Sequence, residues 1–387
     1  MAITLDAYRA GEVRKAYQYS YFLPSPINDN WQWISPAINQ QLEKAAVKLG
    51  ELNAFSRLVP NIDLFIKLHV TNEAVLSSRI EGTQTNMDEA LLPEAEISLE
   101  RRDDWKEVNN YIRALNTAID ELKTLPVSSR LIRQTHAILM ASVRGEYKAP
   151  GEFRISQNWI GGASLVDATF IPPSHEHVPE LMGDLEKFLN NDQLQIPALI
   201  RIAIAHYQFE TIHPFLDGNG RIGRLLITLY LVAAGVLDRP LLYLSAFFEK
   251  NKGLYYDNLT FVRTRNDMQQ WLKYFLVGVE ETATEASNTL SRILQLKIDI
   301  ETTIHDHFGR RAPSATLLLN HLFKEPVISV DDAAQVLKTT YRPANQLIAA
   351  LSQHQIVNEV TGHSRNRLFV FSPYLRIFDS KNSEPVR

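Results

Sequence analysis

Apolar residues recur at three- and four-residue spacings along most of the chain, a pattern that predicts amphipathic α-helices. Residues 1–40 differ, because aromatic residues and prolines dominate them and X-Pro steps disfavour helix. We expect them to form an extended arm packed on a mainly α protein. The predicted helices cover residues 36–56, 61–81, 101–123, 128–142, 178–190, 197–211, 220–234, 253–262 and 267–307.

Residues 145–175 interrupt the helical pattern with closely spaced glycines and prolines. Between them lie short runs such as Asn158-Trp159-Ile160 and Ala168-Thr169-Phe170-Ile171. Short runs of this kind, bounded by turn residues, are typical of strands. The sequence therefore predicts a β-hairpin inserted between helices.

The segment 313–375 has its own pattern of three short helices followed by two short strands. This order is the layout of a winged helix-turn-helix domain. We expect five parts: an N-terminal arm and helix packed on the core, a central domain, a connecting helix, the winged-helix domain and a flexible tail. Their predicted limits are 1–60, 61–280, 281–312, 313–375 and 376–387.

Composition narrows the class of protein. The length of 387 residues suggests two or three domains, and a formal net charge of −4 gives no whole-chain sign of nucleic-acid binding. The absence of cysteine excludes disulfides and thiolate metal sites. The apolar stretch 225–237 is shorter than the roughly 20 residues that span a bilayer. We expect a cytoplasmic protein without a membrane partner.

The run Asp217-Gly-Asn-Gly220 joins two predicted helices and has the composition of an anion-binding turn. The next helix adds free N–H groups and a positive dipole end. Arg221 and Arg224 lie three apart in its first turn, where two cations are unfavourable unless an anion binds. The guanidinium fork suits phosphate oxygens. The alternative is that both arginines are solvated or paired with surface carboxylates.

Three neighbouring residues add chemistry to this turn. His213 has the ordinary pKa of a proton acceptor at neutral pH, although a lone histidine is more often structural. Asp217 is an oxygen ligand suited to Mg²⁺, or else a common turn residue before glycine. Phe215 is expected to anchor the loop in the core. Together they predict a site for transfer of a nucleotide phosphate.

The whole run His213-Pro-Phe-Leu-Asp-Gly-Asn-Gly-Arg-Ile-Gly-Arg224 resembles the signature HPFx[D/E]GNGRxxR of the Fic (Fic/Doc) family. The resemblance to this family extends over roughly residues 60–280. The resemblance implies a Fic-type helical bundle with a β-hairpin flap, and Mg²⁺-dependent transfer of AMP from ATP to Ser, Thr or Tyr hydroxyls of proteins. His213 would be the base and Asp217 would hold Mg²⁺. The loop 213–224 would supply the nucleotide contacts Phe215, Gly218, Asn219, Gly220, Arg221, Ile222, Gly223 and Arg224.

The run from Ser77 to Gly82 is similar to the family's inhibitory motif [S/T]xxxE[G/N]. By this resemblance residues 61–82 would be an inhibitory helix. Glu81 would form a salt bridge with Arg224, occupy the γ-phosphate clamp and keep the enzyme mostly off. The resemblance also leaves a reverse, AMP-removing activity open. The alternative is a plain helix end with a solvated glutamate.

Two further segments resemble family features. Residues 155–175 would be the flap that docks an extended target segment by strand addition, with Ile160, Gly161 and Gly162 beside the main chain of the target. The segment Gly151-Glu-Phe-Arg154 matches one that precedes the flap. Tyr255 and Tyr256 resemble the family's YYxxL stretch; we favour Tyr255 as the residue bordering adenine, although a tyrosine pair in a helix is more often core.

Other functions stay open. The protein could be a nucleotide-sensing transcription regulator that binds DNA through 313–375. Arg342 would start the candidate recognition helix, and Arg365 and Arg367 would lie in the candidate wing. Asp331, Asp332 and Glu359 weaken the positive field of that domain. Related proteins transfer UMP, phosphocholine or phosphate from other donors. The intact arginines favour a triphosphate donor, so we expect ATP to be the donor here. A homodimer is a further open possibility.

Overall fold

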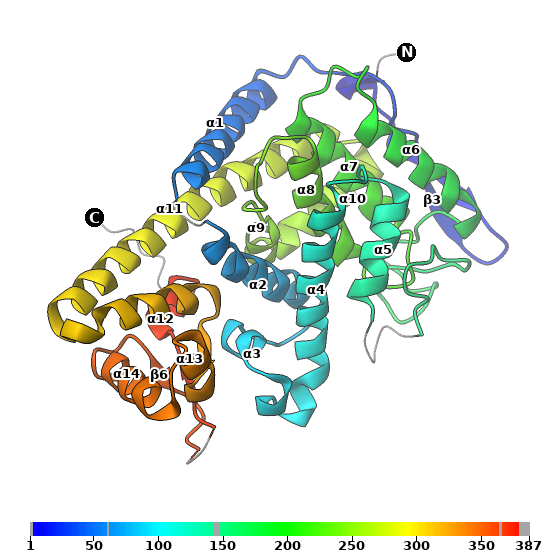
Figure 1. Cartoon of the computed structure of the whole chain (residues 1–387). Helices are drawn as coiled ribbons and strands as arrows, with labels where there is room; N and C mark the ends of the chain where they lie inside the picture. Colours follow the sequence, from blue (N-terminus) through cyan, green and yellow to red (C-terminus); the bar gives the residue numbers. More distant parts are fainter. Residues whose placement is uncertain (1–2, 60–61, 142–146, 364–365, 379–387) are drawn as a thin grey trace. The chain divides into compact units, whose positions relative to one another are not determined.

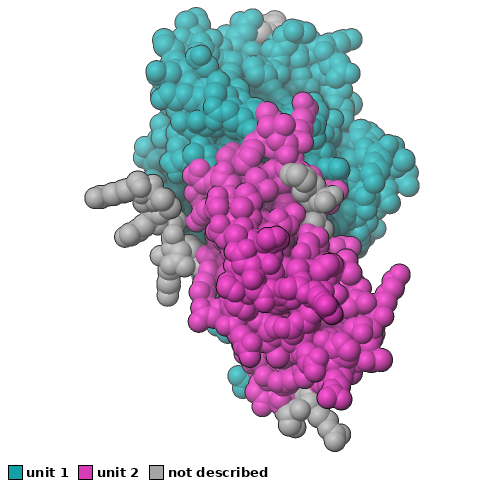
Figure 2. Space-filling model, turned by 60° about the vertical axis from the view of Figure 1, so that its left-hand side comes forward, with its two compact units in different colours: residues 1–53, 73–85, 99–284 teal, residues 54–72, 86–98, 285–387 magenta. Residues whose placement is uncertain are grey.

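The computed structural model describes residues 3–59, 62–141, 147–363 and 366–378. The chain forms two compact units, coloured teal and magenta in Figure 2. Unit 1 contains residues 1–53, 73–85 and 99–284, and unit 2 contains residues 54–72, 86–98 and 285–387. Residue 61, where the predicted inhibitory helix begins, residues 145–146 of the glycine-rich segment and Arg365 of the candidate wing lie outside the described residues.

Unit 1 is built around two consecutive helices, α7 (Ala198–Ile212) and α8 (Asn219–Ala233), which lie side by side near its centre (Figure 1). Every residue of α7 from 199 to 212 is buried. A helix that is covered on all sides has no polar face, which explains why its sequence carries so few charges. α6 (Val178–Asn190) packs on α7, and α4 (Arg102–Glu121) and α5 (Ser129–Leu139) pack on each other and on α8.

The predicted helices are confirmed to within a few residues at each end. The remaining long helices are α1 (Pro36–Leu58), α2 (Asp63–Ile80), α10 (Lys252–Arg265) and α11 (Met268–Phe308). Two short helices, α3 (Met87–Leu91) and α9 (Ser245–Lys250), were not predicted. They are five and six residues long, so neither contains enough turns to show a periodic apolar pattern.

The N-terminal arm is extended, as expected from its prolines. β2 (Gly11–Lys15) and β3 (Ser20–Pro24) pair antiparallel, and β1 (Ile3–Thr4) pairs parallel with β4 (Trp31–Gln32). A side chain at Gly11 would meet the carbonyl oxygen of Leu23 at 2.2 Å, so this pairing requires glycine. The N–H of Phe22 donates to the carbonyl of Ile171 at 3.0 Å, which joins the arm to the flap segment.

The flap 155–175 has less β-structure than the sequence suggests. Its pairing is a single antiparallel bridge, in which the N–H groups of Ile160 and Phe170 donate to each other's carbonyls at 2.9 and 3.1 Å. Gly161 and Gly162 follow at φ of +70°, and the Asp167 carboxylate accepts the next two backbone N–H groups. This turn takes the chain out of the ladder after one pair.

The C-terminal part of unit 2 has the order helix, strand, helix, helix, strand, strand: α12 (Ala312–Lys324), β5 (Val327–Ser329), α13 (Val330–Val336), α14 (Tyr341–Gln353), β6 (Asn358–Glu359) and β7 (Leu368–Val370). The sheet order is β5–β7–β6, antiparallel throughout. The structure thus has one more strand here, β5, than the two that the sequence indicated. Short α15 (Ser372–Leu375) closes the segment.

Among the described residues, no helix combines the length and the apolar character that a membrane span needs.

Phe323 of α12 is fully buried in unit 2 among the rings of Phe65, Phe371 and Tyr374, at centroid distances of 5.0–5.4 Å. We expect Phe323→Ala to lower the free energy of unfolding by about 3–5 kcal/mol, the usual cost of the cavity it leaves. Leu317→Ala on the same helix is the control, because Leu317 is 51% exposed. Urea unfolding checks the pair; equal midpoints would contradict this packing account.

Candidate active site

The turn between α7 and α8 begins with an unusual backbone conformation. His213 caps α7 at φ 50° and ψ 61°, and Gly218 caps α8 at φ 74°. A left-handed residue other than glycine costs roughly 1–2 kcal/mol, so other contacts have to hold it. The Asn219 amide supplies two of these contacts inside the loop: it accepts the N–H of Phe215 at 2.8 Å and donates to the Phe215 carbonyl at 2.9 Å.

A buried histidine that the sequence analysis missed also contacts this turn. His136 of α5 stacks on Phe215 with ring centroids 3.7 Å apart and planes at 5°. Its Nδ1 accepts the N–H of Gly151 at 2.9 Å, so the proton is on Nε2, which donates to the Asp217 carbonyl at 3.0 Å. Burial lowers its pKa to about 4, which keeps this tautomer neutral.

His213 is neutral at physiological pH. Burial first, and then the guanidiniums of Arg263 and Arg154, together lower its pKa to about 3, against the opposing effect of Glu81. The side chain is half-buried, and its Nδ1 is buried without a hydrogen-bond partner among the described residues. A pKa this far below 6.5 makes it a weaker base than a free histidine.

Arg224 is buried and bound to α2 through three hydrogen bonds. Its Nε donates to the Ser77 Oγ at 2.9 Å, and its Nη2 donates to the Ser77 carbonyl at 2.8 Å and to the Glu81 Oε1 at 2.6 Å. Burial alone would raise the pKa of Glu81, but the Arg224 guanidinium holds it below its usual range. The predicted ion pair between Glu81 and Arg224 is therefore present, with the carboxylate ionised.

The Glu81 carboxylate also lies against the glycine loop. A side chain at Gly220 would stand 2.2 Å from its Oε1. α8 begins beside it without a side-chain cap. The free N–H groups and the dipole of such a helix start favour an anion, and Glu81 brings one negative charge to this position.

Arg221 and Asp217 lie at the open end of the loop. The Arg221 Nη1 is 3.2 Å from the Glu107 carboxylate and its side chain is buried, whereas the Asp217 side chain is 49% exposed. Asp217 Oδ1 accepts the N–H of Gly218 at 2.6 Å. Within the described part of the chain, no three His, Cys, Asp or Glu side chains gather as a metal site.

Two further buried carboxyl groups surround Arg224, and the sequence analysis missed both. Glu73 accepts the hydroxyls of Tyr111 at 2.9 Å and Ser245 at 2.5 Å, and burial raises its pKa to about 7. Burial also raises the pKa of Glu210 to about 7, and a side chain at Gly223 would stand 2.1 Å from its Oε1. One signal was available: Glu73, Ser77 and Glu81 are spaced four apart, on one face of α2.

Two family descriptions match this chain: "Fic/DOC family N-terminal" over residues 39–120 and "Fic/DOC family" over residues 126–231. The second match contains the α7–α8 turn and the flap. Residues 39–120 and 126–231 are therefore Fic/DOC family domains. The Fic match ends at residue 231, so it does not extend to the C-terminal helices and strands of unit 2.

Three similar proteins set the scale of the likeness. A "Protein adenylyltransferase Fic" of Aedes aegypti is 28% identical over 49% of this chain and 34% of its own length. A "Probable protein adenylyltransferase" of Aquifex aeolicus is 30% identical over 50% of this chain and 58% of its own length. The chain thus spans about a third to three fifths of these relatives. A Fic family protein from Desulfovibrio desulfuricans shares the fold, with a TM-score of 0.55, 20% identity, and coverage of 87% of this chain and 96% of that one.

Tyr255, which the sequence favoured as the residue bordering adenine, lies in the core of this structure. Tyr255 is 1% exposed, stacks on Phe248 at 4.4 Å, and donates its hydroxyl to the His206 Nε2 at 2.9 Å. The His206 Nδ1 in turn donates to the Gly223 carbonyl at 2.8 Å. Tyr255 is therefore a core residue that holds the first turn of α8, and Tyr256, which is 41% exposed, is the accessible ring.

The remaining predicted site residues fall into two groups. Phe215, Asn219 and Ile222 are buried, so their side chains pack inside the protein at the loop and the first turn of α8. Ile160, Gly161 and Gly162 lie at the flap bridge and the turn after it. A side chain at either glycine would stand within 2.4 Å of the returning segment, so the flap turn requires both.

Tyr255→Phe leaves the His206 Nε2 without a donor, and we expect it to lower the free energy of unfolding by about 1–3 kcal/mol while ATP affinity stays unchanged. Tyr256→Ala should lower ATP affinity by about threefold to tenfold, the worth of one aromatic contact, with little change in stability. Thermal unfolding and calorimetric titration with Mg-ATP test both. If Tyr255→Phe instead lowered ATP affinity at unchanged stability, Tyr255 and not Tyr256 would be the residue bordering adenine, as the sequence suggested.

Proposed function

We propose that this protein transfers AMP from ATP to Ser, Thr or Tyr hydroxyl groups of target proteins or of itself, and that Glu81 holds the activity back. The observation that carries the proposal is the α7–α8 turn, where a neutral His213 precedes an uncapped helix start with Asp217, Arg221 and Arg224 around it. The printed names of the Aedes and Aquifex relatives support the same reaction class.

The reaction needs a base, a held triphosphate and a leaving group. The target oxygen attacks the α-phosphorus, a new P–O bond forms, and the bond from the α-phosphorus to the bridging oxygen breaks as pyrophosphate leaves. The hydroxyl proton passes to the neutral His213 imidazole. The backbone of Gly218 to Gly220, with Arg221 and Arg224, would hold the β- and γ-phosphates. Positioning and charge neutralisation supply most of the rate in such transfers.

Asp217 fits a role as the carboxylate that holds Mg²⁺. It is half-exposed at the loop edge, and only one of its oxygens accepts a backbone N–H within the described residues. Mg²⁺ commonly takes one or two protein carboxylates and fills its other positions with phosphate oxygens and water. When bound, the ion would supply positive charge against the phosphates.

Glu81 would compete with the phosphates for one cation. Its carboxylate is 2.6 Å from the Arg224 Nη2 and lies against Gly220, where an anionic donor would also lie. The Arg224 guanidinium already donates two hydrogen bonds to Ser77 and one to Glu81, so few of its N–H groups are left to bind a γ-phosphate. Productive binding of ATP therefore requires the Glu81 carboxylate to leave.

Glu81→Gly removes this competitor, and we expect it to raise incorporation of labelled AMP by at least about tenfold, the effect of about 1.4 kcal/mol of lost competition. The matched control adds His213→Ala to the same variant, which should return incorporation to background while Mg-ATP binding persists. Autoradiography with labelled ATP and lysate, followed by mass spectrometry of the labelled band, measures both. Equal incorporation by wild type and Glu81→Gly would reject the inhibitory role, and transfer retained without His213 would reject the base.

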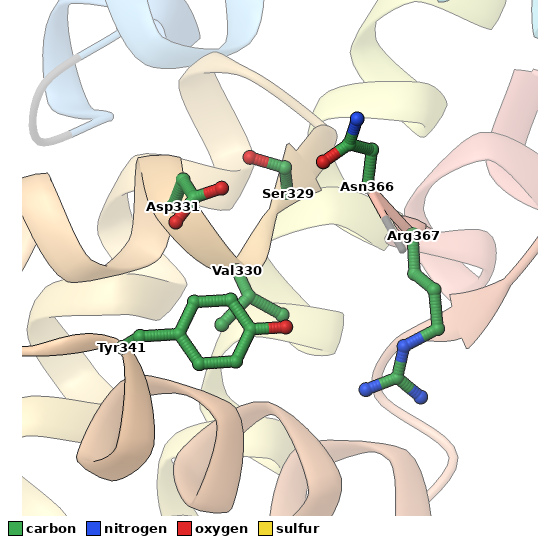
Figure 3. A pocket seen from close by; sticks show the side chains of 6 residues that line it. All are labelled: Ser329, Val330, Asp331, Tyr341, Asn366 and Arg367. Atoms are coloured by element: carbon green, nitrogen blue, oxygen red, sulfur yellow. The ribbon is translucent and has the colours of Figure 1, made fainter. Parts of the chain in front are cut away.

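The winged-helix connectivity of unit 2 favours a second candidate function, DNA binding. Tyr341 and Arg342 are exposed at the start of α14, the candidate recognition helix. Beside them is a cavity of about 290 Å³ (Figure 3), whose rim carries both signs of charge through Asp331 and Arg367. Arg367 also donates to Asn345 at 2.9 Å and lies 3.4 Å from Glu359, so part of its charge is neutralised.

We therefore expect weak, salt-sensitive binding of random duplex DNA, measured by mobility shift at low and high salt. Arg342→Ala should weaken it uniformly across sequences, because a phosphate contact carries no base information. Lys297→Ala on α11, already paired with Glu301, is the control. Absence of a shift at low salt would exclude this function and leave unit 2 as an interaction module.

A further inference from the structure

Arg154, at the start of the flap, binds the backbone of the catalytic turn. Its own N–H donates to the Pro214 carbonyl at 2.9 Å. Its Nε donates to the His213 carbonyl at 3.0 Å, and its Nη2 reaches the Ile212 carbonyl at 3.4 Å. Three consecutive carbonyls of the turn thus accept from one residue.

The same guanidinium also holds both ends of the flap. Its Nη1 donates to the Ser156 carbonyl at 3.1 Å on the outgoing side, and its Nη2 donates to the Pro173 carbonyl on the returning side. Asn158 strengthens this link, because its Nδ2 donates to the carbonyls of His213 at 3.2 Å and Phe215 at 2.8 Å. The flap and the turn are therefore bonded to one buried group.

The partners of Arg154 set it apart from an ordinary buried arginine. Its side chain is almost fully enclosed, at 2% exposure, and within the described residues it forms no ion pair with a carboxylate. A buried cation usually requires a counter-ion; here carbonyl oxygens alone satisfy it. Burial lowers its pKa to about 10, so it still carries its charge at pH 7.

We propose that Arg154 is the positioning residue that fixes the flap relative to His213, so that a target segment docked on the flap presents its hydroxyl to the base. The proposal rests on the transfer function proposed above for its kinetic consequence only. Its structural content is that flap order and the state of the His213 imidazole both depend on Arg154.

Two physical effects would act through this residue. The fork geometry holds His213 in its left-handed conformation and sets the distance from the flap bridge to the imidazole; a displacement of about 1 Å at such a site can cost 100-fold in rate. The positive charge of Arg154 favours the neutral imidazole. The other charges that act on His213 are Arg263 of α10, which has the same sign of effect, and Glu81 of α2, which opposes it.

The test compares Arg154→Gln, Arg154→Lys and Arg201→Gln in the full chain. Arg201 is the matched control, since it is also buried and its Nη1 and Nη2 donate to the carbonyls of Leu189 and Leu194, in α6 and the loop after it. Two readouts need no transfer activity: hydrogen exchange of the Ile160 amide at the flap bridge, and NMR titration of the His213 ring. A third is the kcat and KM of AMP transfer in a Glu81→Gly background.

We expect both Arg154 variants to speed exchange at Ile160 by at least tenfold, raise the KM for the target and lower kcat by about 100-fold. Arg154→Gln should also raise the His213 pKa, although burial and Arg263 still hold it below its usual range, whereas Arg154→Lys, which keeps the charge, should leave it unchanged. Arg201→Gln should lower thermal stability without any of these changes. If Arg154→Lys does not fold, the comparison of Arg154→Gln with Arg201→Gln still tests the proposal.

Unchanged Ile160 exchange and His213 titration in Arg154→Gln would overturn the proposal, as would equal effects of Arg201→Gln. A chain that shows these two changes but transfers no AMP in any form would refute the transfer function and keep the structural role of Arg154. The two failures are thus distinguishable.

Discussion

The burial of Arg224 is the constraint on which the arrangement around the catalytic turn depends. A guanidinium removed from water needs hydrogen-bond acceptors and a counter-charge, and α2 supplies both through Ser77 and Glu81. The other two nearby acids, Glu73 and Glu210, have pKa values raised to about 7, so Glu81 is the carboxylate that is fully ionised beside it. The Arg224 guanidinium and the ionised Glu81 carboxylate therefore neutralise each other, and this ion pair holds the end of α2 against the first turn of α8.

The same cluster gives a physical reason for two glycines of the motif. Gly220 and Gly223 are ordinary helical residues without positive φ, so backbone conformation does not require glycine there. A side chain at these positions would stand 2.2 Å from the Glu81 carboxylate and 2.1 Å from the Glu210 carboxylate, so each carboxylate would have to move. Gly218 differs, since φ is 74° and a side chain would meet the Met140 sulfur at 2.8 Å. The glycines therefore serve two purposes within one short loop.

The sequence predicted what local periodicity and a dense motif can carry: the long helices, the α7–α8 turn, and the candidate pairing of Glu81 with Arg224. It could not predict His136, whose role depends on a stack and two hydrogen bonds to residues 15 and 81 positions away. It favoured Tyr255 because adjacent tyrosines in a helix differ by only about 100° in direction, and only tertiary packing shows which one faces inward. Arg154 matched a family segment, but its partners lie up to 60 residues away.

Burial and charge both act on His213, the base of the proposed reaction. Burial and two guanidiniums make the resting imidazole neutral but weakly basic, and Glu81 offsets this only in part. An anion near an imidazole favours its protonated form and so raises its pKa. A polyphosphate at the start of α8 would bring more negative charge than the single carboxylate that it displaces. Arrival of the donor would then strengthen the base, and because Arg154 and Asn158 already fix the His213 backbone, that gain would require no rearrangement of the turn.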